Sequence, residues 1–265
     1  MYPTLSVLGM KFSSYGVMAL IGLLSGAALY FVSRKKYSLA VKDMVFTVLY
    51  AVVGAFIGAK LLFVIVEWDS VFAPGATVLS VMSSGYVFYG GLIGAALMLV
   101  LYAKKSGISL LVLTDSMLPC ICVTHAVGRV GCFLAGCCYG CETNSPFGVY
   151  FPETGYAPGG IKILPTQLFE AVFLLVLAAV LFFMLSKQNV VGRVTVIYLF
   201  AYSVWRFIIE FYRMDERGSV GMLSTSQFIS IFIFALGVLM IVFGVNNKHK
   251  LNKAKNKEII NNEKI

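Results

Sequence analysis

A histidine and an arginine stand within a long apolar segment that runs from near residue 110 into a cluster of glycines and cysteines at 132–141. His125 and Arg129 are four residues apart, so they share one face of a helix. An ionised arginine at membrane depth is costly and requires a partner or a ligand. Gly128 and Gly131 flank Arg129, and small residues let a second helix or a lipid head group approach closely. The pattern favours a binding role. The alternatives are a histidine that bonds a helix carbonyl and an arginine that extends to the membrane surface.

A second set of polar residues lies in a later apolar segment. Tyr202, Arg206, Glu210 and Arg213 are spaced to form a stripe on one helix face. Charge inside a membrane segment indicates a functional site by default. The alternative is that Arg206 and Glu210 form an ion pair that closes a helix end near the surface.

Two further segments carry polar residues toward the same membrane face. Lys60 follows Gly54 and Gly58 in one apolar segment, and a proline opens another that contains Gln167 and Glu170. Helix capping explains most of the second group, with Glu170 as the exception. Cations that converge from three segments predict an anionic ligand, and at this depth we expect a lipid phosphate.

The composition identifies the protein class that must position these groups. The chain is 59% apolar and 12% charged, with a mean hydropathy of +0.88, whereas soluble domains carry about a quarter charged residues. This excludes a soluble α/β enzyme, and the lack of alternating apolar runs excludes a porin-type barrel. The net charge of +9 lies in short loops and in the C-terminal tail, which indicates membrane topology rather than nucleic-acid binding.

The apolar segments predict an all-α membrane protein with seven spans of about 20 residues each. They lie at 14–32, 43–66, 86–103, 110–130, 167–185, 193–211 and 223–244. Lysine and arginine gather after the first, third, fifth and seventh spans, which places the N-terminus outside and the C-terminus in the cytoplasm. We expect one catalytic domain at 1–245 and a disordered Lys- and Asn-rich tail at 246–265 that touches anionic lipid.

Four stretches resemble, in order and spacing, the signatures of a bacterial enzyme family. They are Phe88-Tyr-Gly-Gly-Leu-Ile-Gly94, Gly128-Arg-Val-Gly-Cys-Phe-Leu-Ala-Gly136, Pro165-Thr-Gln-Leu-Phe-Glu170 and Tyr202-Ser-Val-Trp-Arg-Phe-Ile-Ile-Glu-Phe-Tyr-Arg213. Tyr15-Gly16 is similar to a Tyr-Gly near the family's first span. Over nearly its whole length the chain resembles the prolipoprotein diacylglyceryl transferases, which share the seven-span topology with an outer N-terminus.

The resemblance implies that the chain is a multi-pass transferase of the bacterial cytoplasmic (inner) membrane. Phosphatidylglycerol is the diacylglyceryl donor, and the lipobox cysteine of a preprolipoprotein is the acceptor. At the outer face its thiol displaces glycerol phosphate and forms a thioether, without a metal or other cofactor. The catalytic residues would be Arg206, Arg129, Tyr89, His125 and Glu210. The phospholipid would contact Arg129, Tyr15, Gly90, Gly91, Tyr202, Lys60 and Gln167.

The chain departs from the family pattern at several positions. Tyr89 replaces the histidine before Gly-Gly-Leu-Ile-Gly, and Leu164 replaces the histidine that commonly precedes Pro-Ser/Thr-Gln. Cys132 replaces an asparagine, and an acidic residue is replaced at or near Cys137. A tyrosine with a pKa near ~10 is a poor base at neutral pH unless cations lower it. Tyr89, with Arg129 or Arg206 beside it, is therefore one candidate for the proton acceptor, and His125 is the other.

The six cysteines leave several interpretations open. Apolar filling or disulfide formation comes first. Metal binding comes second, because Cys-Cys-x-x-Cys with a further cysteine and a nearby histidine has the density of a ligand set. A thiol that handles the acyl group comes third. Loss of the family residues also leaves two alternative functions, a transferase for another acceptor and a non-catalytic protein that binds lipid or metal.

Overall fold

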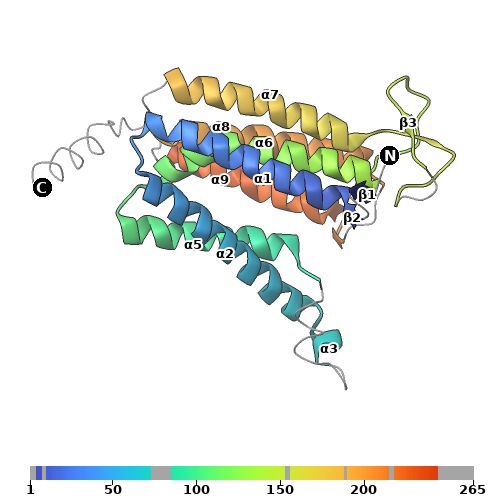
Figure 1. The fold of residues 1–265 in the computed structure, drawn as a ribbon, viewed down its shortest axis with the longest axis horizontal. Helices are drawn as coiled ribbons and strands as arrows, with labels where there is room; N and C mark the ends of the chain where they lie inside the picture. The colour runs from blue at the N-terminus through green and yellow to red at the C-terminus, as the bar shows by residue number, and fades with distance from the viewer. Residues whose placement is uncertain are drawn as a thin grey trace, which may run out of the picture. The chain divides into compact units, whose positions relative to one another are not determined.

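The computed structural model describes residues 4–7, 10–72, 85–152, 156–187, 190–214 and 218–243 (Figure 1). The chain divides into two compact units, one of Leu39–Leu113 and one of Met1–Ser38 with Thr114–Ile265. Seven helices among the described residues are long and apolar enough to cross a membrane, as many as the sequence predicts. The expected tail at 246–265 lies outside the described residues.

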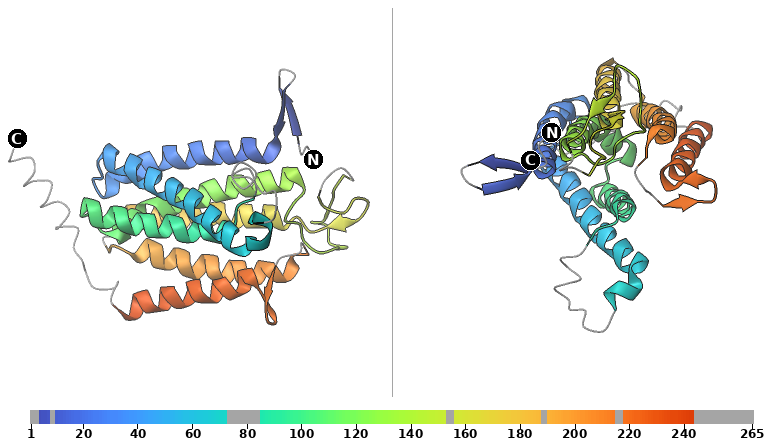
Figure 2. Two further views of the ribbon diagram at one scale, coloured as in Figure 1. Left: turned by 90° about the horizontal axis from the view of Figure 1, so that it is seen from below. Right: turned by 90° about the vertical axis from the view of Figure 1, so that its right-hand side faces the viewer.

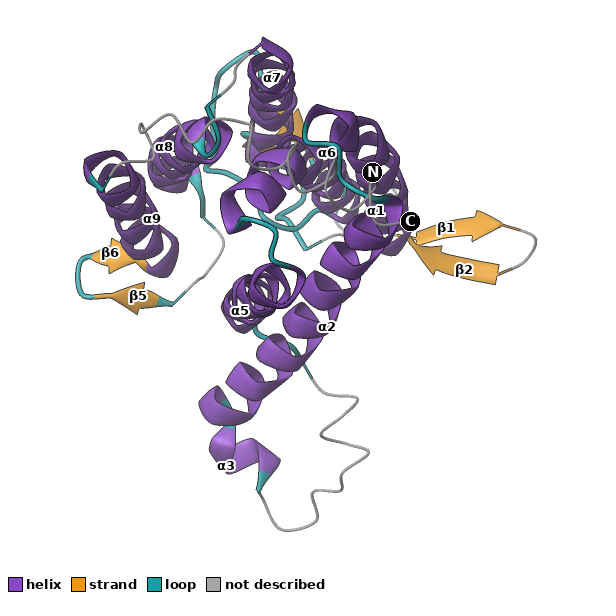
Figure 3. Cartoon of the chain, turned by 90° about the vertical axis from the view of Figure 1, so that its left-hand side faces the viewer, coloured by secondary structure: helices purple, strands orange, loops and turns teal. Residues whose placement is uncertain are grey.

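The larger unit is a bundle in which the long helices run alongside one another (Figures 1 and 3). α8 packs against both α7 and α9. The helices and short 3-10 turns of this unit are α1 (Ser14–Ser33), η1 (Arg34–Lys36), α6 (Leu110–Ala135), α7 (Thr166–Lys187), α8 (Arg193–Ile209), η2 (Glu210–Tyr212) and α9 (Thr225–Val242). The first turn of α6 belongs to the smaller unit.

Two helix ends differ from the sequence expectation in ways that matter for the site. α6 continues to Ala135 rather than ending at 130, so Cys132 is helical. α8 ends at Ile209, and the chain tightens into η2 before Arg213 takes an extended conformation. The predicted stripe on one helix face therefore does not continue as an α-helix to its last member.

Three antiparallel hairpins add strands that the sequence analysis did not predict. β1 (Thr4–Val7) pairs with β2 (Met10–Ser13), β3 (Val149–Tyr150) with β4 (Lys162–Ile163), and β5 (Ser219–Val220) with β6 (Leu223–Ser224). The β1–β2 hairpin extends away from the start of α1 (Figure 2). The hairpins lie before α1, between α6 and α7, and before α9.

Small residues bring α1 against α6. Thr124 Oγ1 donates a hydrogen bond to the Gly22 carbonyl oxygen at 2.9 Å, and a Cβ atom at Gly26 would collide with Thr124 Oγ1. A Cβ atom at Gly131 would lie 2.9 Å from Met18 Cβ, whereas one at Gly128 would meet nothing within 4 Å. Gly131 therefore serves helix packing, and the space beside Gly128 is open.

The smaller unit is organised by a glycine contact between α2 (Val41–Val66) and α5 (Phe88–Ser106), with the short α3 (Trp68–Val71) after α2. A Cβ atom at Gly58 would collide with the Gly90 carbonyl oxygen, and one at Gly94 with that of Gly54. Two small-xxx-small pairs thus face each other, as is typical of closely packed membrane helices. Packing alone therefore accounts for glycine at position 90.

A buried aspartate joins three elements at the end of the larger unit where α8 begins. Asp115 accepts hydrogen bonds from Tyr37 Oη at 3.0 Å, from the Gly192 and Thr195 nitrogens at 2.6 and 2.8 Å, and from Thr195 Oγ1 at 2.6 Å. Burial and the Asp115 charge raise the pKa of Tyr37, so its phenol stays protonated and donates. The sequence analysis missed this cluster.

We expect Asp115→Asn to destabilise the protein by about 1–3 kcal/mol, because the amide nitrogen would face donors that then remain unsatisfied. The free energy of unfolding in detergent measures the effect. Glu142→Gln, at an exposed loop position, is the control and should leave stability unchanged. Equal stability of the two variants would contradict this account of Asp115.

Candidate active site

Glu170 lies at the centre of a group of buried charges in the larger unit. It is in the second turn of α7, and its side chain is 1% exposed. Its Oε2 atom lies 3.0 Å from Arg129 Nε on α6 and 3.9 Å from Arg213 Nη1 after η2. Two segments far apart in the sequence thus bring guanidinium groups to one carboxylate.

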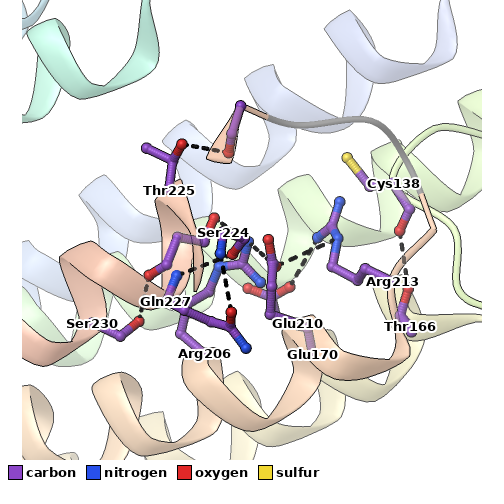
Figure 4. Close-up of polar contacts among 12 residues, drawn as sticks. Cys138, Thr166, Glu170, Arg206, Glu210, Arg213, Ser224, Thr225, Gln227 and Ser230 are labelled. Atoms are coloured by element: carbon purple, nitrogen blue, oxygen red, sulfur yellow. Dashed lines mark hydrogen bonds and ion pairs between the residues drawn. The ribbon is translucent and has the colours of Figure 1, made fainter. Parts of the chain in front are cut away.

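The group continues through a second carboxylate, that of Glu210 (Figure 4). Glu210 Oε2 lies 4.0 Å from Arg213 Nε and 2.7 Å from Arg206 Nη2. Arg206 Nη2 also donates a hydrogen bond to Ser226 Oγ at 2.8 Å. Ser226 is placed by a capping box that starts α9, in which Ser224 and Gln227 bond each other's backbone nitrogens. We call the five charged residues Arg129, Glu170, Arg206, Glu210 and Arg213 the ionic network.

The ionic network has a surplus of positive charge. Its three guanidinium groups and two carboxylates leave a formal charge of +1. Among the described residues, Arg206 Nη1 is buried with no hydrogen-bond partner. Buried donors are normally satisfied, and buried positive charge is normally compensated. The arrangement therefore suits an anion such as a phosphate, which guanidinium groups bind with charge-assisted hydrogen bonds.

His125 and Tyr202 lie at the edge of the ionic network. His125 Nε2 is 3.7 Å from Glu170 Oε1. The rings of His125 and Tyr202 meet edge-on, with centroids 5.7 Å apart. The His125 side chain is 27% exposed, unlike that of Glu170. A partly accessible imidazole beside a carboxylate has the position that a proton acceptor requires.

The turn after α6 brings three thiols together next to the ionic network. Gly136, at φ +80°, ends the helix, and the Sγ atoms of Cys132, Cys137 and Cys138 lie within 4.8 Å of one another. Gln167 Nε2 donates to the Cys137 carbonyl oxygen at 2.7 Å. Hydrogen bonds from the other two thiols and the charges of Arg213 and Arg129 lower the pKa of Cys138.

Comparison with known proteins assigns the chain to a family. The family model for prolipoprotein diacylglyceryl transferase matches residues 3–243. The chain belongs to the prolipoprotein diacylglyceryl transferase family. A Clostridium perfringens protein named phosphatidylglycerol–prolipoprotein diacylglyceryl transferase 2 is 39% identical over 88% of this chain and 91% of its own length. A Clostridium tetani protein named phosphatidylglycerol–prolipoprotein diacylglyceryl transferase is 37% identical over 94% of this chain and 100% of its own.

The larger unit of this transferase brings together most of the predicted site residues. His125 and Arg129 lie next to Glu170, Arg213 connects Glu170 to Glu210 and through it to Arg206, and Tyr202 packs against His125. Tyr15 is 49% exposed on α1 and lies beside Gly131. Gln167 Nε2 donates one hydrogen bond to the cysteine turn, so at least one of its two N–H donors serves the fold.

The remaining predicted residues belong to the smaller unit of the transferase. Tyr89 contacts Phe88, with ring centroids 5.7 Å apart. Lys60 Nζ donates to the Gly85 carbonyl oxygen at 3.3 Å and lies over the rings of two neighbouring aromatic residues. Gly90 and Gly91 are buried against α2. The phospholipid-binding and catalytic roles of these residues stay predictions.

Three residues of the site were missing from the sequence-based assignment. Glu170 was suspected but not assigned, because a carboxylate soon after a proline resembles a helix cap. Arg213 was placed in the stripe without a role, and Ser226 on α9 gave no signal. The one sequence signal for Glu170 was that only apolar residues follow it in its segment. An ionised carboxylate in such a segment needs a buried cation as its partner.

Two apolar grooves flank α8 of the transferase. The groove between α8 and α9 has a volume of about 210 Å³ and is lined in part by Ser203 and Ser230. The groove between α7 and α8 has a volume of about 510 Å³. Val204 and Ile208 line both. Ser230 Oγ donates a hydrogen bond to the carbonyl oxygen of Ser226. The groove between α8 and α9 therefore begins one helical turn from Ser226, whose hydroxyl contacts Arg206.

Proposed function

We propose that the protein transfers a diacylglyceryl group from phosphatidylglycerol to the lipobox cysteine thiol of a preprolipoprotein. The sulfur attacks the glycerol carbon that carries the phosphate. A sulfur–carbon bond forms, the carbon–oxygen bond breaks, glycerol phosphate leaves, and the thiol proton passes to a base. Family membership supports this function, and so do the names of the relatives, which favour it over the alternatives of another acceptor or a non-catalytic role.

The observation that carries the proposal is the positive surplus of the ionic network. The leaving phosphate gains negative charge as the carbon–oxygen bond breaks. Fixed positive groups therefore stabilise the transition state more strongly than they stabilise the bound lipid substrate. In the proposal, Arg206 and Arg129 contact the phosphate. Glu210 and Glu170 hold these guanidinium groups in place before the reaction begins, which is the condition for electrostatic catalysis.

The geometry around the network also suits the rest of a phospholipid. The apolar grooves beside α8 can take acyl chains, and the groove near Ser230 begins close to the contact of Arg206. The space beside Gly128, the residue before Arg129, is open, and in the proposal the head group approaches through it. We therefore propose that the head group lies over the ionic network, with Tyr15 and Tyr202 next to it.

We further propose that the ionic network faces the outside of the bacterial cytoplasmic membrane, with the N-terminus on the same side. Cationic residues gather at the opposite end of the larger unit, where Lys36 Nζ donates to the Ser186 carbonyl oxygen at 3.2 Å. Arg34, Lys35, Lys187 and Arg193 belong to the same end of these helices. Lysine and arginine in short loops favour the cytoplasmic side.

The direct test is a transfer assay with the purified full-length chain. It is supplied with phosphatidylglycerol and a lipobox peptide, and mass spectrometry detects a peptide that has gained a diacylglyceryl group. A peptide with the lipobox Cys replaced by Ser is the matched negative control. Absence of the thioether product, while a competent relative forms it under the same conditions, would refute the proposal.

The proton acceptor can be assigned by a pair of substitutions. If His125 takes the thiol proton, His125→Gln should lower kcat by about 10²–10⁴-fold, and Tyr89→Phe should have little effect. The opposite result assigns the role to Tyr89. The pH dependence of kcat/KM separates the two, because an imidazole and a phenol titrate several pH units apart in water. Normal activity of both variants would exclude both residues as the base.

A further inference from the structure

Three cysteines beside the ionic network form a cluster that the transfer reaction does not explain. The Sγ atoms of Cys132, Cys137 and Cys138 lie within 4.8 Å of one another. In a tetrahedral zinc site the sulfurs are about 3.8 Å apart, as follows from a Zn–S distance of about 2.3 Å. Small rotations of the side chains are therefore enough to bring all three onto one ion.

The backbone that carries the thiols is held in place from several directions. The Cys137 nitrogen donates to the Cys132 carbonyl oxygen at 3.1 Å, and Gln167 Nε2 donates to that of Cys137 at 2.7 Å. Thr166 Oγ1 donates to the Cys138 carbonyl oxygen at 2.9 Å (Figure 4). Cys138 has φ +65°, a conformation that is uncommon for a residue other than glycine. This turn places the thiols of Cys137 and Cys138 next to that of Cys132 on α6.

The alternative roles of the cysteines account for these observations less well. Apolar filling explains buried Cys120 and Cys122, but Cys137 and Cys138 are only half-buried. A disulfide would use only two of the three neighbouring sulfurs, and the part of the chain that the structure describes, which contains all six cysteines, has no disulfide. A thiophilic ion uses all three.

We propose that Cys132, Cys137 and Cys138 bind one thiophilic divalent cation of the zinc class and leave its fourth coordination position open. Three protein ligands with one open position are the arrangement of zinc sites that act on a substrate. This assignment departs from the sequence-based expectation that no metal takes part.

The open position suits the thiol of the acceptor, an extension that rests on the transfer reaction proposed above. A thiol that coordinates such an ion would give up its proton, which passes to the base of the proposed reaction. The thiolate sulfur can then form the new sulfur–carbon bond while glycerol phosphate leaves with the electrons of the carbon–oxygen bond. The product is a thioether, which carries no negative charge and binds such an ion less strongly than a thiolate. The cluster would thus compensate for the family histidine that Tyr89 replaces.

The metal site is tested on the full chain in detergent, purified without a histidine tag, reduced and stripped of metal. We expect it to bind one equivalent of Zn²⁺ or Co²⁺, with a thiolate-to-cobalt charge-transfer band. Cys137→Ser and Cys138→Ser should weaken binding by more than about 100-fold, since even outer partners of metal ligands matter by roughly 10–100-fold. Cys141→Ser, in the same loop but outside the cluster, is the matched control.

A second measurement on the unmodified chain guards against variants that fail to fold. Zn²⁺ should protect Cys132, Cys137 and Cys138 from alkylation and leave Cys141 reactive, as peptide mass mapping reports. Failure of the reduced chain to take up metal, or unchanged affinity in both cluster variants, would overturn the site. So would a disulfide between two of the three in the isolated protein with no metal bound.

The acceptor step has its own readout. A lipobox peptide should shift the cobalt band, and its Ser counterpart should not. An unchanged band would overturn coordination of the acceptor. Metal binding with no transferase activity would instead contradict the proposed function and leave the metal site intact, so the two failures are distinguishable.

Discussion

Arg206→Ala is expected to lower diacylglyceryl transfer by about 10²–10³-fold, the effect of removing one donor that stabilises developing negative charge. The substitution removes one of three guanidinium groups, so two cations and two carboxylates remain and the positive surplus disappears. Arg129→Ala should act in the same direction. The quantity to measure is kcat/KM for phosphatidylglycerol with a saturating lipobox peptide.

Arg193→Ala is the matched control for Arg206→Ala. Arg193 is an exposed arginine at the first residue of the same helix, far along the chain from the ionic network. Its removal should change kcat/KM by less than about twofold, because exposed charges contribute little. Full activity of a correctly inserted Arg206→Ala variant would eliminate the proposed role of the ionic network.

Glu170→Gln is expected to impair both activity and stability. The change preserves side-chain size but removes the charge that faces Arg129, Arg213 and His125. Removing one partner of a buried ion pair costs roughly 3–5 kcal/mol, because the remaining charge is uncompensated. Arg129 would also lose the carboxylate that orients it, so we expect transfer to fall by at least about 100-fold.

Activity and stability can be separated by comparison with Asp115→Asn. Asp115 is also a buried carboxylate of the larger unit, but its donors are Tyr37, Gly192 and Thr195, none of which belongs to the site. That variant should lose stability and keep most of its activity at temperatures where it is folded. If Glu170→Gln behaves like Asp115→Asn, Glu170 has a structural role only.

The helices of the protein could be predicted from sequence because each is encoded locally. A run of about 20 apolar residues satisfies its own backbone in lipid only as a helix, and all seven predicted segments contain such a helix among the described residues. Helix ends were less accurate. α6 extends to Ala135, and Gly131 within the extension lies against Met18 of α1.

The sequence was enough to recognise the charged residues of the site but not to predict which of them form ion pairs. Arg129 and Arg206 were evident because ionised groups are rare in apolar segments. The sequence could not reveal that Arg213 links Glu170 to Glu210, because that link depends on η2 and on the extended backbone after it. Gly90 and Gln167 were predicted to contact lipid, which stays a prediction, and only the structure could show that Gly90 also lies in a helix contact and that the Gln167 amide nitrogen bonds the cysteine turn.

The amino-acid sequence by itself determined the membrane-spanning helices, the candidate cations and the family resemblance, since all three are written in local composition and short motifs. Only the tertiary structure decided which groups meet: Glu170 with Arg129 and Arg213, Glu210 with Arg206, and the three thiols after α6. The physical reason is that ionic and coordination contacts depend on distances of a few ångströms between separate segments. Those distances are set by packing of the helices and turns, which local sequence patterns do not encode.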